Sequence, residues 1–347
     1  RGIVYACDER GERRGEIGGG GYLLAFRLDP QTGKLTFINE QESLCPEPSY
    51  ICMDKSRKYL LVSHCSDPGH VTKIRKNEDG TFSNEVQFDD TGLSVFRIRE
   101  DGGIGEMCDL SITKGNESIK AGGEVSVDPM SGHIQLVKVI PRLHCVVPSM
   151  DGEVYLTCDK GMDCIYTYQL NRETGKLNRL DQFETGHKVF PRYAASHPTL
   201  PVFYVNHEFV PVLDALQYDK ETGKVKKIFE VPLLFEDPGL IDGRPAGAQD
   251  ILVSPDGKTL YCSLFGINSI SVMSLKGDGE PVLKQTIPCG GKMPRGLQIS
   301  PDGKYLFSGN MLSGDITAFG IMEDGTLKDL QKNYEAVSPS AIRFYIP

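Results

Sequence analysis

The chain has 347 residues, a formal net charge of −9 and a pI of about 5.4. Such an acidic chain lacks the basic face that nucleic-acid binding requires, so we exclude a nucleic-acid partner. No signal peptide and no run of about eighteen apolar residues is present, which argues against a membrane protein or export. The 10 cysteines are scattered without any Cys-x-x-Cys pair, so we expect reduced core cysteines and a cytoplasmic protein.

In chain order, the predicted elements are short strands joined by turns, beginning with a strand at 3–6. The glycine run at 18–21 does not connect a strand to a helix, so we predict no dinucleotide or phosphate site there. Turns with the pattern Asp/Asn-x-x-Thr-Gly-Lys join outer strands as hairpins. They occur at 29–34, 171–176 and 219–224, with a shorter version at 323–326.

A second class of turn repeats along the chain and defines its units. The clearest copies are Ser254–Tyr261 (SPDGKTLY) and Ser300–Phe307 (SPDGKYLF). With three weaker copies, the repeats end at positions 61, 156, 204, 261 and 307, and the successive steps are 95, 48, 57 and 46. Because the first step is double the second, we expect a degenerate copy near residue 108.

A period of about 45–50 residues, built from short strands and turns, is typical of a β-propeller. The 347 residues hold about seven such units. No stretch has a helical period, so we predict one all-β domain over 1–347, a seven-bladed β-propeller. The seventh unit would combine the N-terminal run 3–6 with the C-terminal run 341–345, which closes the ring and removes exposed sheet edges.

One segment, at about 66–91, interrupts this repeat. It is rich in charge and glycine and is much longer than an ordinary propeller loop, so we expect an insertion. It is either a solvated loop or a lid over a pocket. The nearby run of His64, Cys65, Asp67 and His70 has no recognised metal-binding spacing, and we predict no metal site.

Propeller geometry predicts which residues meet at one end of the central channel. The inner strand of a blade runs along the channel, the repeated turn reverses it, and the second strand returns over nearly the same length. A residue before the inner strand therefore meets one about 15 positions later. The pairs are Ser49 with His64, His144 with Asp159, Arg192 with Glu208, Asp250 with Phe265, and Arg295 with Asn310.

These residues should surround one pocket at the channel mouth. Carboxylate, imidazole and guanidinium groups together suit proton transfer on a small anionic substrate. We assign substrate binding to four of them: His64, Asp250, Arg295 and Asn310. A structural interpretation is also open, in which Arg192 ties two blades together by bonding carbonyls and Glu208 is its ion-pair partner. His144 would then be a half-buried histidine with satisfied hydrogen bonds.

Several segments resemble the seven-bladed lactonase propellers, which include the cycloisomerase-type 6-phosphogluconolactonases and the 3-carboxy-cis,cis-muconate lactonizing enzyme. The segments are 141–144 (PRLH), 191–198 (PRYAASHP), 204–208 (YVNHE), 248–257 and 290–296. The resemblance covers essentially the whole chain. It implies that His144, Arg192 and Glu208 are the catalytic residues.

The chain departs from the family pattern at two places. It has Pro141-Arg142-Leu143-His144 where the family pattern resembles Pro-His-x-His, and Leu264-Phe265 where the family has an Asp-Arg pair. The missing arginine would be an anchor for phosphate or carboxylate. Arg142, which we add to the substrate-binding residues, or Lys73 of the insertion could replace it. If neither does, the substrate differs from 6-phosphogluconolactone.

The resemblance implies a lactone-processing enzyme that needs no cofactor and no metal, with a small anionic lactone or carboxylate as substrate. The favoured reaction is hydrolysis of a sugar-acid lactone, with Arg192 on the developing oxyanion. Glu208 would be the general base, acting on water or on a proton beside the carbonyl, and His144 would donate a proton or hold the carboxylate. Two alternatives stay open. One is a muconate-type cyclase that closes a diacid to a lactone, and the other is a propeller that binds a partner without catalysis, because a fold does not decide function.

Overall fold

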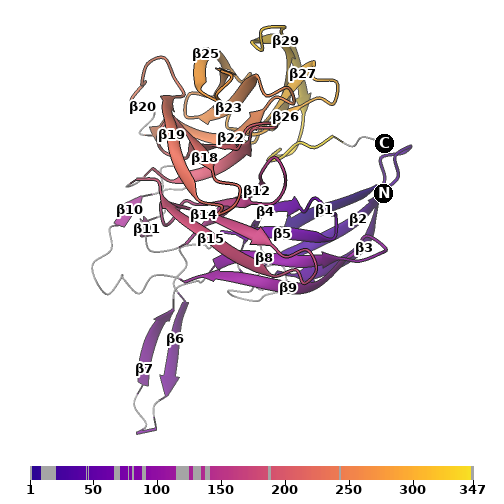
Figure 1. Ribbon diagram of the computed structural model, residues 1–347, viewed down its shortest axis with the longest axis vertical. Helices are drawn as coiled ribbons and strands as arrows, with labels where there is room; N and C mark the ends of the chain where they lie inside the picture. Colours follow the sequence, from indigo (N-terminus) through magenta and orange to yellow (C-terminus); the bar gives the residue numbers. More distant parts are fainter. Residues whose placement is uncertain are drawn as a thin grey trace. The chain divides into compact units, whose positions relative to one another are not determined.

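The structure is a computed structural model that describes residues 2–8, 21–43, 45, 47–65, 71–76, 78–79, 82–87, 91–114, 125–127, 134–136, 141–186, 189–241 and 244–344. All regular secondary structure in these ranges is β, as the sequence predicts (Figure 1). Within them, no helix is long and apolar enough to cross a membrane.

Antiparallel meanders of three or four strands form the propeller blades. The first sheet has the order β1 (Ile3–Asp8), β2 (Tyr22–Leu28) and β3 (Leu35–Glu42). The second has the order β4 (Pro48–Met53), β5 (Tyr59–His64), β8 (Thr91–Ile98) and β9 (Ile104–Thr113). The third has the order β12 (Leu143–Pro148), β13 (Tyr155–Asp159), β14 (Cys164–Leu170) and β15 (Leu177–Glu184).

Three more four-stranded sheets follow in chain order. The fourth consists of β16 (Pro191–Ser196), β17 (Val202–His207), β18 (Val212–Tyr218) and β19 (Val225–Pro232). The fifth consists of β22 (Gly247–Val253), β23 (Thr259–Phe265), β24 (Ser269–Leu275) and β25 (Pro281–Pro288). The sixth consists of β26 (Pro294–Ile299), β27 (Tyr305–Asn310), β28 (Asp315–Ile321) and β29 (Leu327–Glu335).

The described residues also contain three two-stranded hairpins. They are β6 (Val71–Lys76) with β7 (Phe82–Gln87), β10 (Val125–Val127) with β11 (Ile134–Leu136), and β20 (Leu240–Ile241) with β21 (Arg244–Pro245). The β6–β7 hairpin lies within the segment 66–91, between two neighbouring strands of the second sheet. The glycines at 18–20 and the residues Asp67 and His70 lie outside the described residues.

The chain divides into two compact units. Unit 1 contains residues 1–146, 159–162 and 170–178, and unit 2 contains residues 147–158, 163–169 and 179–347. In unit 1, buried side chains from β2, β5 and β8 pack together, among them Leu23, Leu60 and Phe96. In unit 2, the core runs between successive sheets, as Tyr204 of β17 and Ile251 of β22 show.

The repeated turn has the same hydrogen bonds in its two clearest copies. Ser300 Oγ donates to Asp302 at 2.6 Å and accepts the N–H of Tyr305 at 3.0 Å. Ser254 makes the equivalent bonds at 2.6 and 3.0 Å. The glycine of each turn, Gly257 or Gly303, has a φ of 71° or 72°, which only glycine adopts without strain.

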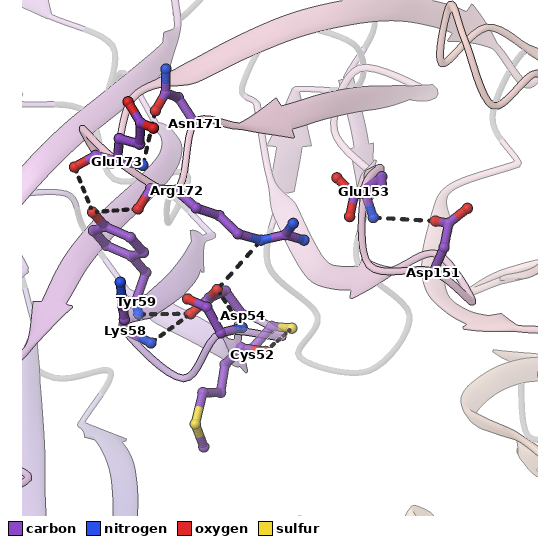
Figure 2. Close-up of polar contacts among 11 residues, drawn as sticks. Cys52, Asp54, Lys58, Tyr59, Asp151, Glu153, Asn171, Arg172 and Glu173 are labelled. Carbon is purple, nitrogen blue, oxygen red and sulfur yellow. Dashed lines mark hydrogen bonds and ion pairs between the residues drawn. The ribbon is translucent and has the colours of Figure 1, made fainter.

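In the copy at 54–61, an aspartate takes the place of that serine (Figure 2). The buried Asp54 carboxylate accepts the N–H groups of Ser56, Lys58 and Tyr59, each at 2.8 Å. Arg172 Nε lies 3.7 Å from the same carboxylate. The turn therefore tolerates different residues at its first position, provided that a side-chain acceptor remains there.

One prediction about the repeat is wrong. Residue 108 is not in a further copy of the turn but in β9, the fourth strand of the second sheet. The first step is long because the β6–β7 hairpin is inserted between β5 and β8, and because residues 114–142 separate β9 from β12. The predicted outer hairpins are confirmed, since the turns at 29–34, 219–224 and 323–326 each join two paired strands.

Seven of the 10 cysteines are buried, as predicted for core residues. Burial raises the pKa of the Cys262 thiol to about 12, so this thiol stays protonated and apolar in character at neutral pH. At the C-terminus, the predicted strand at 341–345 is not formed over the described residues 341–344.

Candidate active site

Four of the residues predicted to surround the channel mouth lie where the pairing of an inner strand with its neighbour changes register. The shifts fall between Pro48 and Tyr50, Pro191 and Ala194, Ala248 and Ile251, and Pro294 and Gly296. The residues inside these irregularities include Ser49, Arg192, Asp250 and Arg295. Bulges re-aim side chains and are frequent next to active sites. In each of these four blades, the residue predicted at the channel mouth thus lies in a bulge, which changes the direction of its side chain.

Side chains of the second strand stabilise these bulges. Asn206 of β17 accepts the N–H of Tyr193 at 2.9 Å, and Ser263 of β23 accepts the N–H of Asp250 at 3.0 Å. A bulge leaves a backbone N–H without its partner in the ladder, and a buried N–H needs another acceptor. In both bulges, a backbone N–H therefore donates a hydrogen bond to a side chain of the neighbouring strand.

Arg192 and Glu208 form the buried ion pair of the site. Arg192 lies in β16, Glu208 directly follows β17, and Nη1 is 2.6 Å from Oε2. Their side chains are 4% and 3% exposed. The backbone N–H of Glu208 donates to the carbonyl of Phe190 at 2.9 Å, which anchors the carboxylate next to the inner strand. The predicted pairing of these two residues is confirmed, whereas their catalytic roles stay predictions.

The sixth sheet contains the same arrangement with a different partner. Arg295 takes the position of Arg192, but its Nη1 lies 3.3 Å from the sulfur of Met311. Met311 N donates to Met293 O at 2.9 Å, just as Glu208 N donates to Phe190 O. Met311 is therefore the equivalent of Glu208, and the predicted partner Asn310 is one position too early.

Asn310 itself is buried and bonded within its own sheet. Its Oδ1 accepts from Ser308 at 3.0 Å, and its Nδ2 donates to Thr317 at 3.3 Å. Both ends of the amide thus have structural partners. The contacts in the structure do not support the predicted role of Asn310 in substrate binding.

Asp250 connects the fifth and sixth sheets. Its Oδ1 accepts the N–H of Ile251 at 2.8 Å, and its Oδ2 accepts the N–H of Leu297 in β26 at 2.7 Å. Burial raises the pKa of the Asp250 carboxyl, against the opposing effect of these N–H donors and of Arg343 and Arg192. Asp250 therefore acts electrostatically on Arg192 while it ties two blades together.

Gly247 is a residue of the site that the sequence analysis did not identify. A Cβ atom added there would lie 1.6 Å from the carbonyl oxygen of Glu208 and 2.5 Å from Cε1 of Phe265. Only a residue without a side chain allows β22 to pass so close to the Glu208 backbone. A glycine at the first position of an inner strand is the signal that could have pointed to it.

The remaining predicted residues belong to unit 1. His144 is buried, and its Nε2 lies 3.6 Å from the sulfur of Cys65, a contact that the sequence analysis missed. Arg142 directly precedes this inner strand, β12, and its backbone N–H donates to Asp159 Oδ1 at 2.7 Å. His64 is fully buried, with Nε2 2.8 Å from Ser94 Oγ, so its contacts place it inside the sheet and not at an open surface.

Within the described ranges, no group of three or more His, Cys, Asp or Glu residues could hold a metal ion. The polar groups near Arg192 include the Glu208 carboxylate at 2.6 Å and the Asp250 carboxyl, which acts on it electrostatically. A buried guanidinium beside a carboxylate can bind anionic groups and stabilise an oxyanion, and the carboxylate can accept a proton.

Comparison with known proteins agrees with this chemistry. The chain is 25% identical over 332 residues to a 6-phosphogluconolactonase of Formosa agariphila, covering 94% of this chain and 81% of the relative. It is 24% identical over 328 residues to a 6-phosphogluconolactonase of Bacillus subtilis, with the same coverage of 94% and 81%. Both similarities extend over nearly the whole chain.

Among solved structures, the fold is similar to that of the periplasmic gluconolactonase PpgL of Pseudomonas aeruginosa. The TM-score is 0.77 at 20% identity, with 99% of this chain and 85% of the other covered. The model of a family described as lactonase, 7-bladed beta-propeller, matches residues 1–344. The chain therefore belongs to the seven-bladed β-propeller lactonase family.

Proposed function

We propose that the protein hydrolyses a small lactone and that the buried Arg192–Glu208 pair carries the reaction. The observation that supports it most directly is the 2.6 Å contact between two side chains that are 4% and 3% exposed, each held by a strand end. Membership in the lactonase family and the relatives named 6-phosphogluconolactonase support the same reaction class.

In the proposed mechanism, Glu208 takes a proton from water while the water oxygen attacks the lactone carbonyl carbon. Arg192 donates to the oxyanion that develops; a guanidinium has five N–H donors and can contact both a carboxylate and an oxyanion. The bond from the carbonyl carbon to the ring oxygen then breaks, and the ring oxygen takes up a proton. Lactone and water thus give the open hydroxy acid, and no other reactant is consumed.

An assay of the purified chain tests this function. The panel is 6-phosphogluconolactone, gluconolactone, unphosphorylated lactones with apolar substituents, and 3-carboxy-cis,cis-muconate for the cyclase alternative. Acid release above that of a Glu208→Gln variant supports hydrolysis, and loss of muconate absorbance would favour the cyclase instead. If none of these compounds is turned over faster than by the variant, the protein is not a lactone-processing enzyme of this kind.

His144 is proposed to supply the proton to the leaving ring oxygen. We expect His144→Gln to lower kcat about 100-fold, the usual size of a general-acid contribution, with a smaller change in KM. Activity and the thermal midpoint of unfolding would be measured on the same preparation. Since His144 is buried beside Cys65, a Cys65→Ala variant serves as the packing control. Unchanged kcat in a folded His144→Gln variant would remove His144 from the mechanism.

We also propose that the ring has seven blades and is closed by its chain ends. The first sheet has three strands, and β1 is its edge. A cavity of about 600 Å³ is lined by Ile3 and Tyr5 of β1, with Met53 and Ile98. The matching family model describes a 7-bladed propeller, which supports seven blades here.

Contacts of the C-terminal residues with the sixth sheet also support this closure. Phe344 packs edge-on against Phe307, with ring centroids 5.5 Å apart, and Ser340 O lies 2.9 Å from where a Cβ of Gly296 would be. The segment 339–344 therefore covers β26 and β27, as the inner strand of a following blade would. Hydrogen exchange should show protected amides in β1, and faster exchange there when residues 339–347 are removed. Identical exchange in both chains would contradict the closure.

A further inference from the structure

Three phenylalanine rings form a continuous group next to the Arg192–Glu208 pair. Phe190 precedes β16, Phe209 follows Glu208, and Phe265 ends β23. Ring centroids are 4.8 Å apart between Phe190 and Phe209 and 6.4 Å apart between Phe209 and Phe265, both in edge-to-face geometry. We call this group the phenylalanine wall.

Residues of the phenylalanine wall contact the backbone segments that position the proposed catalytic pair. The carbonyl of Phe190 accepts the N–H of Glu208 at 2.9 Å. Phe265 Cε1 and Glu208 O both lie within 2.5 Å of the position that a Cβ of Gly247 would take. Phe190 and Phe265 are 8% and 4% exposed, while Phe209 is half-buried and presents the accessible part of the wall.

Further apolar side chains lie at the same end of the sheets. The segment from β19 to Gly247 carries Phe235 and Leu240, which are 66% and 70% exposed. Leu312, shortly after β27, is 64% exposed. Strands β17, β19 and β27 all end at the end of the meander where the inner strands begin, so these exposed residues lie toward the same end of the sheets as the wall.

The charges beside the wall do not suit a phosphate dianion. Arg192 already faces Glu208 at 2.6 Å, and Asp250 is a second carboxylate that acts on the same guanidinium. A phosphate placed here would face the carboxylates of Glu208 and Asp250 as well as the guanidinium groups of Arg192 and Arg343, without the cation surplus that phosphate sites use. Phe265 adds an apolar ring beside Phe209 and no charge.

We propose that the phenylalanine wall makes this site selective for lactones that carry an apolar ring or chain and no phosphate. The substituent would pack against Phe209, while Arg192 and Glu208 act on the lactone carbonyl. This inference rests on the proposed lactone hydrolysis and specifies its substrate class. Burial of an apolar substituent favours binding roughly in proportion to the area removed from water, and aromatic rings add edge-to-face contacts.

The test compares kcat/KM for three substrates: dihydrocoumarin as the apolar lactone, gluconolactone, and 6-phosphogluconolactone. We expect the wild-type chain to prefer dihydrocoumarin over 6-phosphogluconolactone at least 10-fold. Phe265→Arg should shift this ratio at least 10-fold toward the phosphorylated lactone, because it supplies a cation. Phe265→Leu, which remains apolar, should leave the ratio within about threefold.

Because Phe265 is buried, its arginine variant can fail to fold, and a second position avoids this problem. Phe209 is half-buried, so Phe209→Arg should fold and shift the ratio in the same direction, with Phe209→Leu as its control. If the wild-type chain prefers 6-phosphogluconolactone, the wall is not selective and the proposed hydrolysis still stands. If no lactone is hydrolysed above the Glu208→Gln background, the proposed function fails and the substrate class with it.

Discussion

Replacement of Glu208 by glutamine is expected to lower kcat at least about 100-fold on any lactone that the protein hydrolyses. Glutamine has nearly the same shape as glutamate but cannot take a proton from water. The substrate KM should change less than kcat, because the lost group acts on water and not on the bound lactone. Steady-state kinetics with a continuous acid-release assay give both constants.

The same substitution has a structural consequence that must be separated from the catalytic one. Glu208 neutralises Arg192 at a position where both side chains are nearly inaccessible to water. Leaving a buried charge without its partner typically costs about 3–5 kcal/mol of unfolding free energy. Chemical denaturation of the variant measures this loss, and kinetics should be recorded at a temperature where the variant is fully folded.

A double variant distinguishes catalysis from a structural tie between strands. Arg192→Met combined with Glu208→Gln removes both charges, so much of the lost stability should return while activity stays low. Glu230→Gln is the matched control, because Glu230 is 59% exposed and pairs with Lys227 at the surface. Its activity and stability should stay close to wild type. Recovery of activity in the double variant would show that the pair is only structural.

Substitution of Gly247 by alanine should impair both folding and activity. The added Cβ would lie 1.6 Å from the Glu208 carbonyl oxygen, which is far inside van der Waals contact, so the backbone of β22 or of Glu208 has to move. Overpacking of this kind costs about 1–3 kcal/mol or more. Because a shift of about 1 Å in a catalytic group can cost 100-fold in rate, we expect kcat to fall by about 10- to 100-fold.

Gly277 provides the control for the alanine substitution. It lies in the turn between β24 and β25, and a Cβ added there meets nothing within 4 Å. Gly277→Ala should therefore leave activity and the thermal midpoint of unfolding almost unchanged. A Gly247→Ala variant as stable and active as Gly277→Ala would mean that the close approach of β22 to Glu208 is not needed.

Some features follow from the sequence because they depend on residues close together in the chain. The turn at 300–305 closes through Ser300 and Asp302, and any stretch with the same residues can form the same bonds, as 254–259 does. Arg192 and Glu208 lie on two consecutive strands joined by one short turn, so strand length alone brings them together. Residue 108 lies in β9 and not in a copy of the turn, because a count of residues does not reveal the β6–β7 insertion.

The tertiary structure decided the features that depend on contacts between blades. Gly247 meets the carbonyl of Glu208, and Phe265 packs on Phe209, between different sheets and at separations that follow no period of the sequence. The bulges also shift strand ends by one position, so Arg295 meets Met311 and not Asn310. The sequence alone thus determined the all-β repeat and the Arg192–Glu208 pair, because local hydrogen bonds and strand lengths suffice for them. What lies against the pair depends on how successive sheets pack, and only the packed structure shows this.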